Sequence, residues 1–183
     1  ANVSHELKTP LTTVSGYAEL IRDGIAAPAD IPRFAGKIAE ESGRMITLVG
    51  DIIRLSRFDE KEVPVVVEEL ALMDICREIL DRLAVNAAKK QVTLSLAGEP
   101  VCIHGSREVV SEIIYNILDN AVKYNREGGS VAVTLKQCVD GVQVEVCDTG
   151  IGIPKEQLPR VFERFYRVDK SHSKAIGGTG LGL

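Results

Sequence analysis

Apolar residues near the start of the chain recur at alternating steps of four and three. They are Leu7, Leu11, Val14, Ala18, Ile21 and Ile25. This spacing places them on one face of an α-helix, at the heptad period of a coiled-coil seam. A second series, after a turn at residues 26–32, consists of Phe34, Ile38, Met45, Leu48, Ile52 and Leu55, with Glu41 as a polar intruder. The pattern predicts two amphipathic helices in an antiparallel hairpin.

A hairpin of this kind leaves half of its apolar stripe in water when it stands alone. Pairing with a second copy buries that stripe in a four-helix bundle, so we expect a homodimer. The alternative is that the hairpin packs against the second domain of its own chain. The strict heptad spacing of the seam favours the dimer.

The pattern changes near Pro64, where the second domain is expected to begin. Strands are predicted at the β-branched run 65–67 and at the alternating run 92–96. The stretch between them has helical spacing at Ile75, Ile79, Leu83 and Ala87. We place the domain boundary near residues 60 to 64, which divides the chain into residues 1–60 and 61–183.

A further helix and a hairpin are predicted after residue 105. Ser106 is a suitable N-cap, and the helix carries Val109, Ile113, Ile117, Leu118 and Ala121 before Gly128 and Gly129 end it. Alternating runs at 131–135 and 142–146 flank Asp140-Gly141, a dipeptide favoured in tight turns. Strands and helices interleave, so the expected fold class is α+β, with a sheet packed against helices.

The composition excludes several classes of protein. The chain has 183 residues, of which 45% are hydrophobic and 26% are charged, with a net charge of −4. This is the composition of a soluble globular chain, and it carries no basic field that would hold nucleic acid. Its longest apolar runs fall short of the roughly 18 residues of a membrane helix. We expect a piece of a longer protein, with any membrane anchor outside it.

The four cysteines, Cys76, Cys102, Cys138 and Cys147, form neither a CxxC pair nor a zinc cluster. Reduced, buried thiols are the favoured interpretation, and a Cys138–Cys147 bridge across a hairpin stays possible.

The first candidate for chemistry is the segment 4–10, Ser-His-Glu-Leu-Lys-Thr-Pro. His5 falls beside the apolar seam, so its imidazole should face solvent. An exposed histidine is usually passive, but Glu6 can orient the ring or accept its proton, Thr9 lies one turn further along, and Pro10 removes a backbone donor. Neutral imidazole is a nucleophile near pH 7, and its phosphorylated form suits a phosphoryl carrier.

The second candidate is a polar row on the helix after Ser106. Glu112, Asn116, Asn120 and Lys123 follow at steps of four, four and three, which puts their side chains on one face. We place Ile113, Ile117 and Ala121 on the opposite face. Carboxamide oxygens suit Mg²⁺, and a lysine suits phosphate. An ordinary solvated face would carry mixed Lys and Glu instead of two mid-helix asparagines.

Two glycine-containing segments complete the set. Asp148 follows a predicted strand and precedes Gly150 and Gly152; its carboxylate can accept from the exocyclic amine of adenine, and the glycines let backbone approach a flat ring. The run 177–182 has bare amides that could wrap phosphate oxygens. Its spacing fits neither the P-loop nor a dinucleotide-binding turn. Each of these segments by itself is common in ordinary turns.

In this order the segments resemble the motifs of the sensor histidine kinases of two-component signalling. Residues 4–10 resemble the H-box, 112–124 the N-box, 148–152 the G1 box, 162–166 the F-box and 178–183 the start of the G2 box. The resemblance spans essentially the whole chain. It implies an antiparallel helical hairpin that forms a dimeric four-helix bundle, followed by a Bergerat-type (GHKL) α/β sandwich that binds ATP. It also implies a further strand and helix beyond residue 183.

The resemblance implies a role for each matching residue. His5 would be the phosphoacceptor, Glu6 its proton-handling neighbour, and Thr9 would align water for dephosphorylation of the response regulator. Asn116 and Asn120 would hold Mg²⁺. The nucleotide would be contacted by Asn116, Asn120, Lys123, Tyr124, Asp148, Gly150, Gly152, Ile153, Phe165, Arg167, Gly178, Thr179, Gly180, Leu181 and Gly182. Phe162 and Phe165 would hold a mobile lid over residues 154–178, whereas His104 and His172 match no motif.

The resemblance therefore implies an ATP-dependent autokinase that phosphorylates His5 and passes the phosphoryl group to an aspartate of a response regulator receiver domain, with phosphatase activity toward that regulator. The linker 59–64 would be a hinge, and the chain would be the cytoplasmic region of a protein in the cell membrane. One alternative is a Bergerat-group ATPase in which Glu112 activates water, which His5 and the absence of clamp domains argue against. Another is a silent dimerisation module, which the intact motifs argue against.

Overall fold

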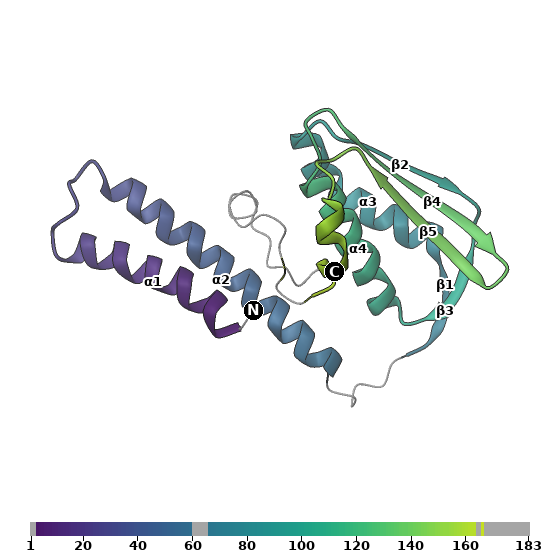
Figure 1. Cartoon of the computed structure of the whole chain (residues 1–183), viewed down its shortest axis with the longest axis horizontal. Helices are drawn as coiled ribbons and strands as arrows, with labels where there is room; N and C mark the ends of the chain where they lie inside the picture. The colour runs from purple at the N-terminus through teal and green to yellow at the C-terminus, as the bar shows by residue number, and fades with distance from the viewer. Residues whose placement is uncertain (1–2, 60–65, 164–165, 167–183) are drawn as a thin grey trace. The chain divides into compact units, whose positions relative to one another are not determined.

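The computed structural model describes residues 3–59, 66–163 and 166 (Figure 1). It divides into two compact units. One holds the N-terminal helices, and the other holds the strands and helices of Pro64–Pro159. Each unit is described by itself.

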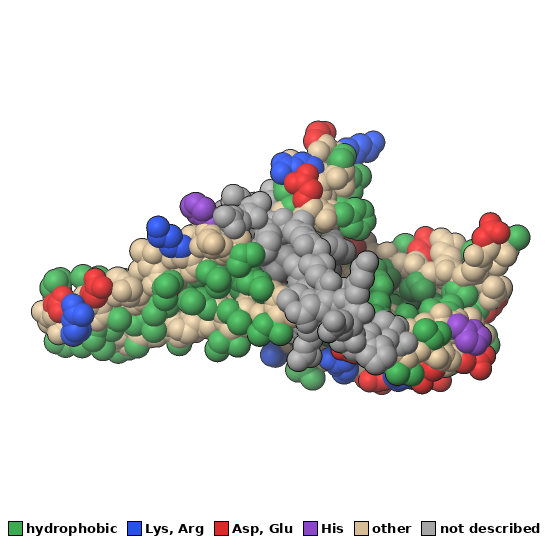
Figure 2. Space-filling view, turned by 90° about the horizontal axis from the view of Figure 1, so that it is seen from below, with side chains coloured by type: hydrophobic (Ala, Val, Ile, Leu, Met, Phe, Trp, Pro, Cys, Tyr) green, Lys and Arg blue, Asp and Glu red, His purple; other side chains and the backbone are tan. Residues whose placement is uncertain are grey.

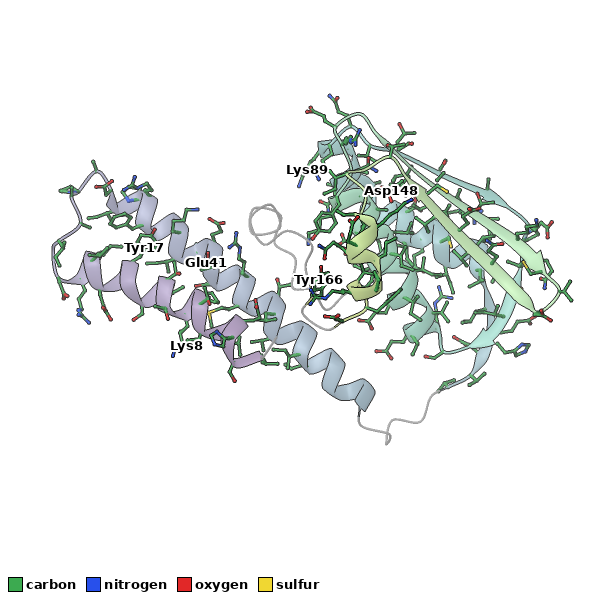
Figure 3. All side chains as sticks on the ribbon, viewed as in Figure 1. Lys8, Tyr17, Glu41, Lys89, Asp148 and Tyr166 are labelled. Atoms are coloured by element: carbon green, nitrogen blue, oxygen red, sulfur yellow. The ribbon has the colours of Figure 1, made fainter. Side chains whose placement is uncertain are left out.

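The N-terminal unit contains the predicted helical hairpin. Helix α1 spans Val3–Arg22 and α2 spans Ile31–Asp59, and the two run side by side in opposite directions (Figure 1). The amides of Ile25 and Ala26 both donate to the Leu20 carbonyl, which closes the end of α1. The ring of Tyr17, labelled in Figure 3, lies 4.9 Å from that of Phe34, measured between centroids, and joins the two helices near their turn.

The apolar seam of α1 is only half covered within this hairpin. Leu7, Val14 and Ile21 are half-buried, whereas Leu11, Ala18 and Ile25 are exposed, Leu11 at 55% and Ile25 at 70%. On α2 the predicted series is half-buried at Phe34, Ile38, Met45 and Ile52 and buried at Leu48, while the Leu55 side chain lies outside the described residues. Exposed apolar side chains remain on α2 at Ile31, Ile46, Val49 and Ile53. Figure 2 shows hydrophobic side chains gathered along the hairpin.

The second unit is a sandwich of two small sheets and two helices. Its elements are β1 (Glu68–Ala71), α3 (Leu72–Lys89), β2 (Thr93–Gly98), β3 (Cys102–Gly105), α4 (Arg107–Lys123), β4 (Ser130–Cys138), β5 (Gly141–Asp148) and the 3₁₀-helix η1 (Lys155–Arg160). The larger sheet has the order β2-β4-β5, with β2 parallel and β5 antiparallel to β4, and β1 pairs antiparallel with β3. Helices α3 and α4 lie on one face of the larger sheet (Figure 1).

The core of this unit lies between the two helices and the larger sheet. The helical spacing of α3 buries all four predicted positions, Ile75, Ile79, Leu83 and Ala87. The alternation predicted for β4 is equally clear, because Val131, Val133 and Leu135 are buried and Thr134 is exposed. All of these apolar side chains are removed from water when the domain folds. Burial of each Val, Leu or Ile side chain contributes roughly 1.5–3 kcal/mol to stability.

The face predicted for the isoleucines of α4 is wrong. Ile113 is 55% exposed and Ile117 is 38% exposed, and the buried face consists of Ile114, Leu118, Ala121 and Val122. The reason is geometric, since successive helical residues are about 100° apart. The residues two positions after Glu112 and Asn116, which are Ile114 and Leu118, therefore lie on the opposite side of the helix. Ile113 and Ile117 are only one position away and lie beside the polar row.

Several boundaries also differ from the prediction. Val66 and Val67 are exposed and precede β1, which begins at Glu68, and residue 65 lies outside the described residues. Helix α4 ends at Lys123, before the two glycines at 128 and 129. The hairpin of β4 and β5 is confirmed, with Cys138 opposite Gly141. Strand β3 was not predicted.

The cysteines are all free thiols, but three of them differ from the prediction of burial. Cys76 is buried, whereas Cys102, Cys138 and Cys147 are exposed. Cys138 pairs with Gly141 at the turn, while Cys147 pairs with Ala132 towards the other end of the same hairpin, so no bridge joins them. No group of three or more His, Cys, Asp or Glu residues suited to a metal occurs within the described part of the chain. Of the helices described, none is both long enough and apolar enough to cross a membrane.

Candidate functional site

His5 lies in the first turn of α1 and is exposed, as predicted. Its ring makes no hydrogen bond to another described residue, so the imidazole is open to a reaction partner. Glu6 follows it and is half-buried, and Thr9 is exposed one turn later. The Thr9 hydroxyl donates to the His5 carbonyl at 3.2 Å, which links the two residues along the helix.

The helix around His5 carries a proline in its interior. Pro10 has no N–H to donate to the carbonyl four residues earlier, so one hydrogen bond of α1 is missing there. Threonine hydroxyls add side-chain bonds on both sides of this gap. Thr12 donates to the Lys8 carbonyl at 2.8 Å and Thr13 to the Thr9 carbonyl at 3.2 Å.

The polar row of α4 is present as predicted. Ser106 caps the helix by accepting from the Val109 amide at 3.5 Å, which sets the phase of the turns that follow. Asn116 and Asn120 are one turn apart and half-buried. Neither carboxamide makes a side-chain hydrogen bond to another described residue. The oxygen atoms of both neutral carboxamides are therefore accessible to a ligand.

This donor set fits a magnesium ion. Mg²⁺ prefers oxygen ligands and keeps several of its waters, so a site built from one or two protein oxygens and substrate phosphates is usual. The Asn116 and Asn120 carboxamides supply such oxygens. Since they are neutral, they do not repel the negative charge of the phosphates.

The C-terminal end of α4 has a partner for every carbonyl from Asn120 to Tyr124. The backbone amide of Tyr124 donates to the Asn120 carbonyl, and that of Asn125 donates to the Val122 carbonyl. The Asn125 side chain donates to the Ala121 carbonyl at 3.0 Å, and the Lys90 ammonium donates to the Lys123 carbonyl. The Ile151 amide donates to the Tyr124 carbonyl at 3.1 Å. The carbonyls that a helix end leaves without an intrahelical partner are here bonded to groups of the protein.

The last of those bonds ties α4 to the loop that follows β5. Asp148, labelled in Figure 3, ends this strand and is exposed. One carboxylate oxygen, Oδ1, accepts from the Gly150 amide at 2.8 Å. Gly150 lies so close to α4 that an added Cβ would stand 2.6 Å from the Tyr124 carbonyl oxygen, and Gly152 has a φ of +71°. Both glycines are therefore required by the backbone, for reasons of their own separate from the predicted approach to a flat ring.

The segment after η1 contains part of the predicted F-box. Arg160 forms an ion pair with Glu163 at 3.0 Å, and this hydrogen-bonded contact lowers the pKa of the Glu163 carboxyl. The Arg160 guanidinium also lies 4.2 Å from the centroid of the Tyr166 ring. Phe162 is exposed, as is Ile153. The predicted site residues outside the described part of the chain are Phe165, Arg167, Gly178, Thr179, Gly180, Leu181 and Gly182.

The structure brings the row of α4 together with the Asp148 loop, and it places His5 in the other unit. Lys123 and Tyr124, both half-buried, lie where these two elements meet. The sequence analysis did not identify Lys90, Asn125 and Thr149, whose hydrogen bonds stabilise the place where α4 meets the Asp148 loop. One signal was available for Asn125, because asparagine is favoured just beyond the end of a helix.

Two protein-family models match the chain. The family described as His Kinase A (phospho-acceptor) domain matches residues 1–61, which contain His5. The family described as histidine kinase-, DNA gyrase B- and HSP90-like ATPase matches residues 105–183, which contain α4 and Asp148.

Curated relatives match over the whole chain. It is 38% identical over 187 residues to the sensor histidine kinase WalK of Bacillus subtilis (strain 168), of which it covers 31%. It is 37% identical over 184 residues to the sensor-like histidine kinase SenX3 of Mycolicibacterium smegmatis (strain ATCC 700084 / mc(2)155), of which it covers 48%. The chain thus spans less than half of the length of each of these relatives.

Solved structures share the fold. Histidine kinase AdeS of Acinetobacter baumannii matches with a TM-score of 0.71 at 19% identity, over 98% of this chain and 87% of that one. Full-length ShkA in complex with AMPPNP matches with a TM-score of 0.67 at 27% identity, over 98% of this chain and 37% of that one. The helical hairpin and the Bergerat-type sandwich predicted from the sequence are therefore confirmed as the fold class.

A phosphoacceptor domain followed by an ATPase domain of this type is an arrangement that the chain shares from end to end with WalK and SenX3. With His5 inside the matched phosphoacceptor domain and the carboxamide row and Asp148 inside the matched ATPase domain, the chain belongs to the sensor histidine kinases of two-component systems.

Proposed function

We propose that this chain is the part of its protein that binds ATP, transfers the γ-phosphoryl group to His5, and then delivers it to an aspartate of a response regulator. The observation that carries the proposal is the tie between Tyr124 and Ile151, because it joins the carboxamides of α4 to the Asp148 carboxylate in one site. An exposed histidine on a separate helix is the matching acceptor. Residues 1–60 would form the dimerisation and phosphotransfer domain and residues 61–183 the catalytic domain.

The nucleotide would be recognised by groups on both sides of this tie. The Asp148 carboxylate would accept a hydrogen bond from the adenine amine, which guanine lacks at that position. Gly150, Gly152 and Ile153 would lie beside the ring. Lys123 and Tyr124 would line the phosphate and nucleoside side, and the glycine-rich run 178–182 would contact phosphate oxygens.

The phosphoryl transfer itself would depend on position and charge. Asn116 and Asn120 would hold Mg²⁺, which offsets negative charge on the phosphates when it is bound. A nitrogen of the neutral His5 ring would attack the γ-phosphorus while the bond to the ADP oxygen breaks. Glu6 would accept the proton of the ring, and Arg167 would offer a cation to the γ-phosphoryl group.

Phosphatase activity toward the regulator would use Thr9. Its hydroxyl has one donor, which is engaged with the His5 carbonyl at 3.2 Å. The oxygen can still accept from water, since a hydroxyl oxygen has two lone pairs. A water held in this way would turn its own lone pair toward the phosphoryl group of the regulator.

The exposed apolar stripe of the hairpin supports a homodimer. Leu11 and Ala18 on α1, and Ile25 just beyond its end, alternate with half-buried residues of the same seam, and Ile46, Val49 and Ile53 share one face of α2. A second hairpin would cover both rows in a four-helix bundle. The other partner would be a receiver domain; a relative in fold, ThkA, has been solved in complex with the response regulator protein TrrA. We further propose that this region is cytoplasmic, with any membrane attachment elsewhere in the protein.

Autophosphorylation tests the proposal directly. The protein carrying this chain would be incubated with γ-labelled ATP and Mg²⁺, alongside its His5→Gln, Asn116→Ala and His104→Gln variants. We expect acid-labile, alkali-stable label on the unmodified protein and on the His104→Gln control, whose exposed histidine lies on β3. Label that survives in His5→Gln would overturn the assignment of the acceptor. Free phosphate release without any label would indicate an ATPase instead.

A further inference from the structure

Asn125 is the one buried polar residue of the described chain, with 7% of its surface exposed. Its side chain uses all four of its hydrogen-bonding positions. Nδ2 donates to the Ala121 and Ser130 carbonyls, each at 3.0 Å, and Oδ1 accepts from the Arg126 amide at 2.9 Å and the Thr149 hydroxyl at 3.2 Å. A buried amide that is fully satisfied in this way rigidifies its surroundings.

The hydrogen bond between Thr149 and Asn125 connects the end of α4 to the loop that follows β5. Thr149 lies between Asp148 and Gly150, and its hydroxyl oxygen also accepts from the Ser130 amide at 2.8 Å. The Thr149 hydroxyl therefore bridges the end of α4 and the start of β4 at the residue next to the adenine-reading carboxylate. The Thr149 amide donates to the Ser130 carbonyl at 3.1 Å, so the backbone there is held by a separate bond.

At Gly129, beside this bridge, there is no room for a side chain. A Cβ added to Gly129 would stand 2.1 Å from Asn125 Oδ1 and 2.6 Å from Thr149 Oγ1. Both are far inside van der Waals contact, so an alanine at this position would push the two side chains apart. The glycine thus leaves room for the hydrogen bond between Asn125 and Thr149.

We propose that Asn125 and Thr149 are positioning residues for nucleotide binding, whose hydrogen bond holds the Asp148 carboxylate at a set place relative to Asn116 and Asn120. Neither residue is assigned a contact with the nucleotide. The inference rests on the proposed function, since it assumes that Asp148 reads adenine. It adds that adenine selectivity depends on a hydrogen bond between two residues to which the resemblance assigns no role.

The test removes the hydroxyl of Thr149 and keeps the shape of its side chain. In Thr149→Val the hydroxyl loses both its bond to Asn125 and its bond from the Ser130 amide, while the backbone bonds of Thr149 and Ile151 keep the loop attached to Ser130 and Tyr124. Thr149→Ser restores the hydroxyl. Thr134→Val is the matched control, because Thr134 is exposed on β4 and has no part in the bridge. Gly129→Ala disrupts the same hydrogen bond by placing a methyl group against Asn125 Oδ1 and Thr149 Oγ1.

The measurements are the dissociation constants for ATP and for GTP, by titration well below the melting temperature of each variant. We expect Thr149→Val and Gly129→Ala to weaken ATP binding about fivefold to tenfold, a loss comparable in free energy to the net contribution of one hydrogen bond. GTP binding should change less, so the preference for ATP falls. Thr149→Ser and Thr134→Val should keep both the affinity and the preference.

The outcomes separate the two proposals. If the unmodified protein shows no preference for ATP over GTP, the adenine assignment of Asp148 fails, and the proposed nucleotide site fails with it. If the unmodified protein prefers ATP and Thr149→Val keeps the full affinity and preference, only the positioning role is wrong. A lower melting temperature with unchanged binding constants would show that the bond serves stability alone, which also overturns the inference.

Discussion

The backbone amide of Gly150 donates to Asp148 Oδ1 at 2.8 Å, so the loop itself orients the carboxylate of Asp148. No cation forms an ion pair with this carboxylate among the residues that the structure describes. Its second oxygen is left to accept from a ligand, and an exposed, preoriented acceptor is what recognition of an amine requires. A first prediction follows from this geometry.

Asp148→Asn should weaken ATP binding about 10-fold to 100-fold, which corresponds to the loss of one hydrogen bond to a charged group. The asparagine oxygen can still accept from the Gly150 amide, so the loop should stay in place. The nitrogen then faces the adenine amine, and two donors meet. Titration with ATP measures the effect. Asp140→Asn, at the exposed β4–β5 turn, serves as a control that should bind normally; equal affinity in both variants would contradict the role of Asp148.

A charge on the exposed face of α2 should break the dimer. Ile46 is 75% exposed in a single hairpin. Burial of an isoleucine contributes about 1.5–3 kcal/mol, and a symmetric interface contains it twice, so Ile46→Asp should raise the dimer dissociation constant at least about 100-fold. Sedimentation equilibrium measures this constant.

The control for that experiment is Val139→Asp, at the turn between β4 and β5, where the side chain is fully exposed. It should leave the dimer intact. An unchanged dissociation constant in Ile46→Asp would mean that the stripe on α2 is not the interface.

Replacing Pro10 should stabilise the helical hairpin. Pro10→Ala restores a backbone donor inside α1 and removes a ring that crowds the preceding turn, so we expect the free energy of unfolding to rise by about 1–3 kcal/mol. Denaturant unfolding followed by circular dichroism measures the change. Pro32→Ala is the matched control, because Pro32 lies in the first turn of α2, where proline is tolerated. A gain of the same size in the control would refute this explanation.

Cys76 should behave differently from the other three thiols. Burial raises the pKa of the Cys76 thiol, because the thiolate would lose its hydration in the core. At low pH the thiol is neutral in both the folded and the unfolded chain. Above about pH 8.5 the unfolded chain ionises first, so the stability contributed by Cys76 is lost as the pH rises toward its folded pKa.

Thiol labelling gives the measurement for this prediction. Under native conditions a disulfide reagent should react quickly with Cys102, Cys138 and Cys147, which are exposed, and with Cys76 only when the protein unfolds. The rate of the slow reaction should increase as the pH is raised above about 8.5. Four thiols that react at one rate would show that the core around Cys76 opens freely.

Local patterns were enough to predict most of the elements. The heptad spacing from Leu7 to Ile25 predicted α1, the series from Ile75 to Ala87 predicted α3, and the two alternating runs predicted the β4–β5 hairpin. Each depends on a period of the backbone, which neighbouring residues set by themselves. The Asn116–Asn120 row and the Asp148 loop were predicted for the same reason, since both are defined by residues close together in the chain.

Which side of a helix is buried was predicted less well than the helix itself. On α4, helical geometry puts Ile114 and Leu118 opposite the polar row, so the placement of Ile113 and Ile117 on that side was an error in applying the helical period. The tertiary structure shows what the buried side packs against, which is α3 and the sheet. The end of α4 at Lys123 was missed likewise, because its final carbonyls are taken by Lys90, Asn125 and Ile151, two of which come from other elements.

By itself, the sequence determined the helical hairpin, the order of the motifs and the functional groups that His5, Asn116 and Asp148 present, because these are properties of residue type and short-range spacing. Only the tertiary structure decided that Tyr124 would accept from Ile151 and that Asn125 would bond to Thr149. Those partners lie 27 and 24 positions apart in the numbering. Such contacts form only when β4 and β5 fold back onto the end of α4, and no periodicity in the chain encodes that meeting.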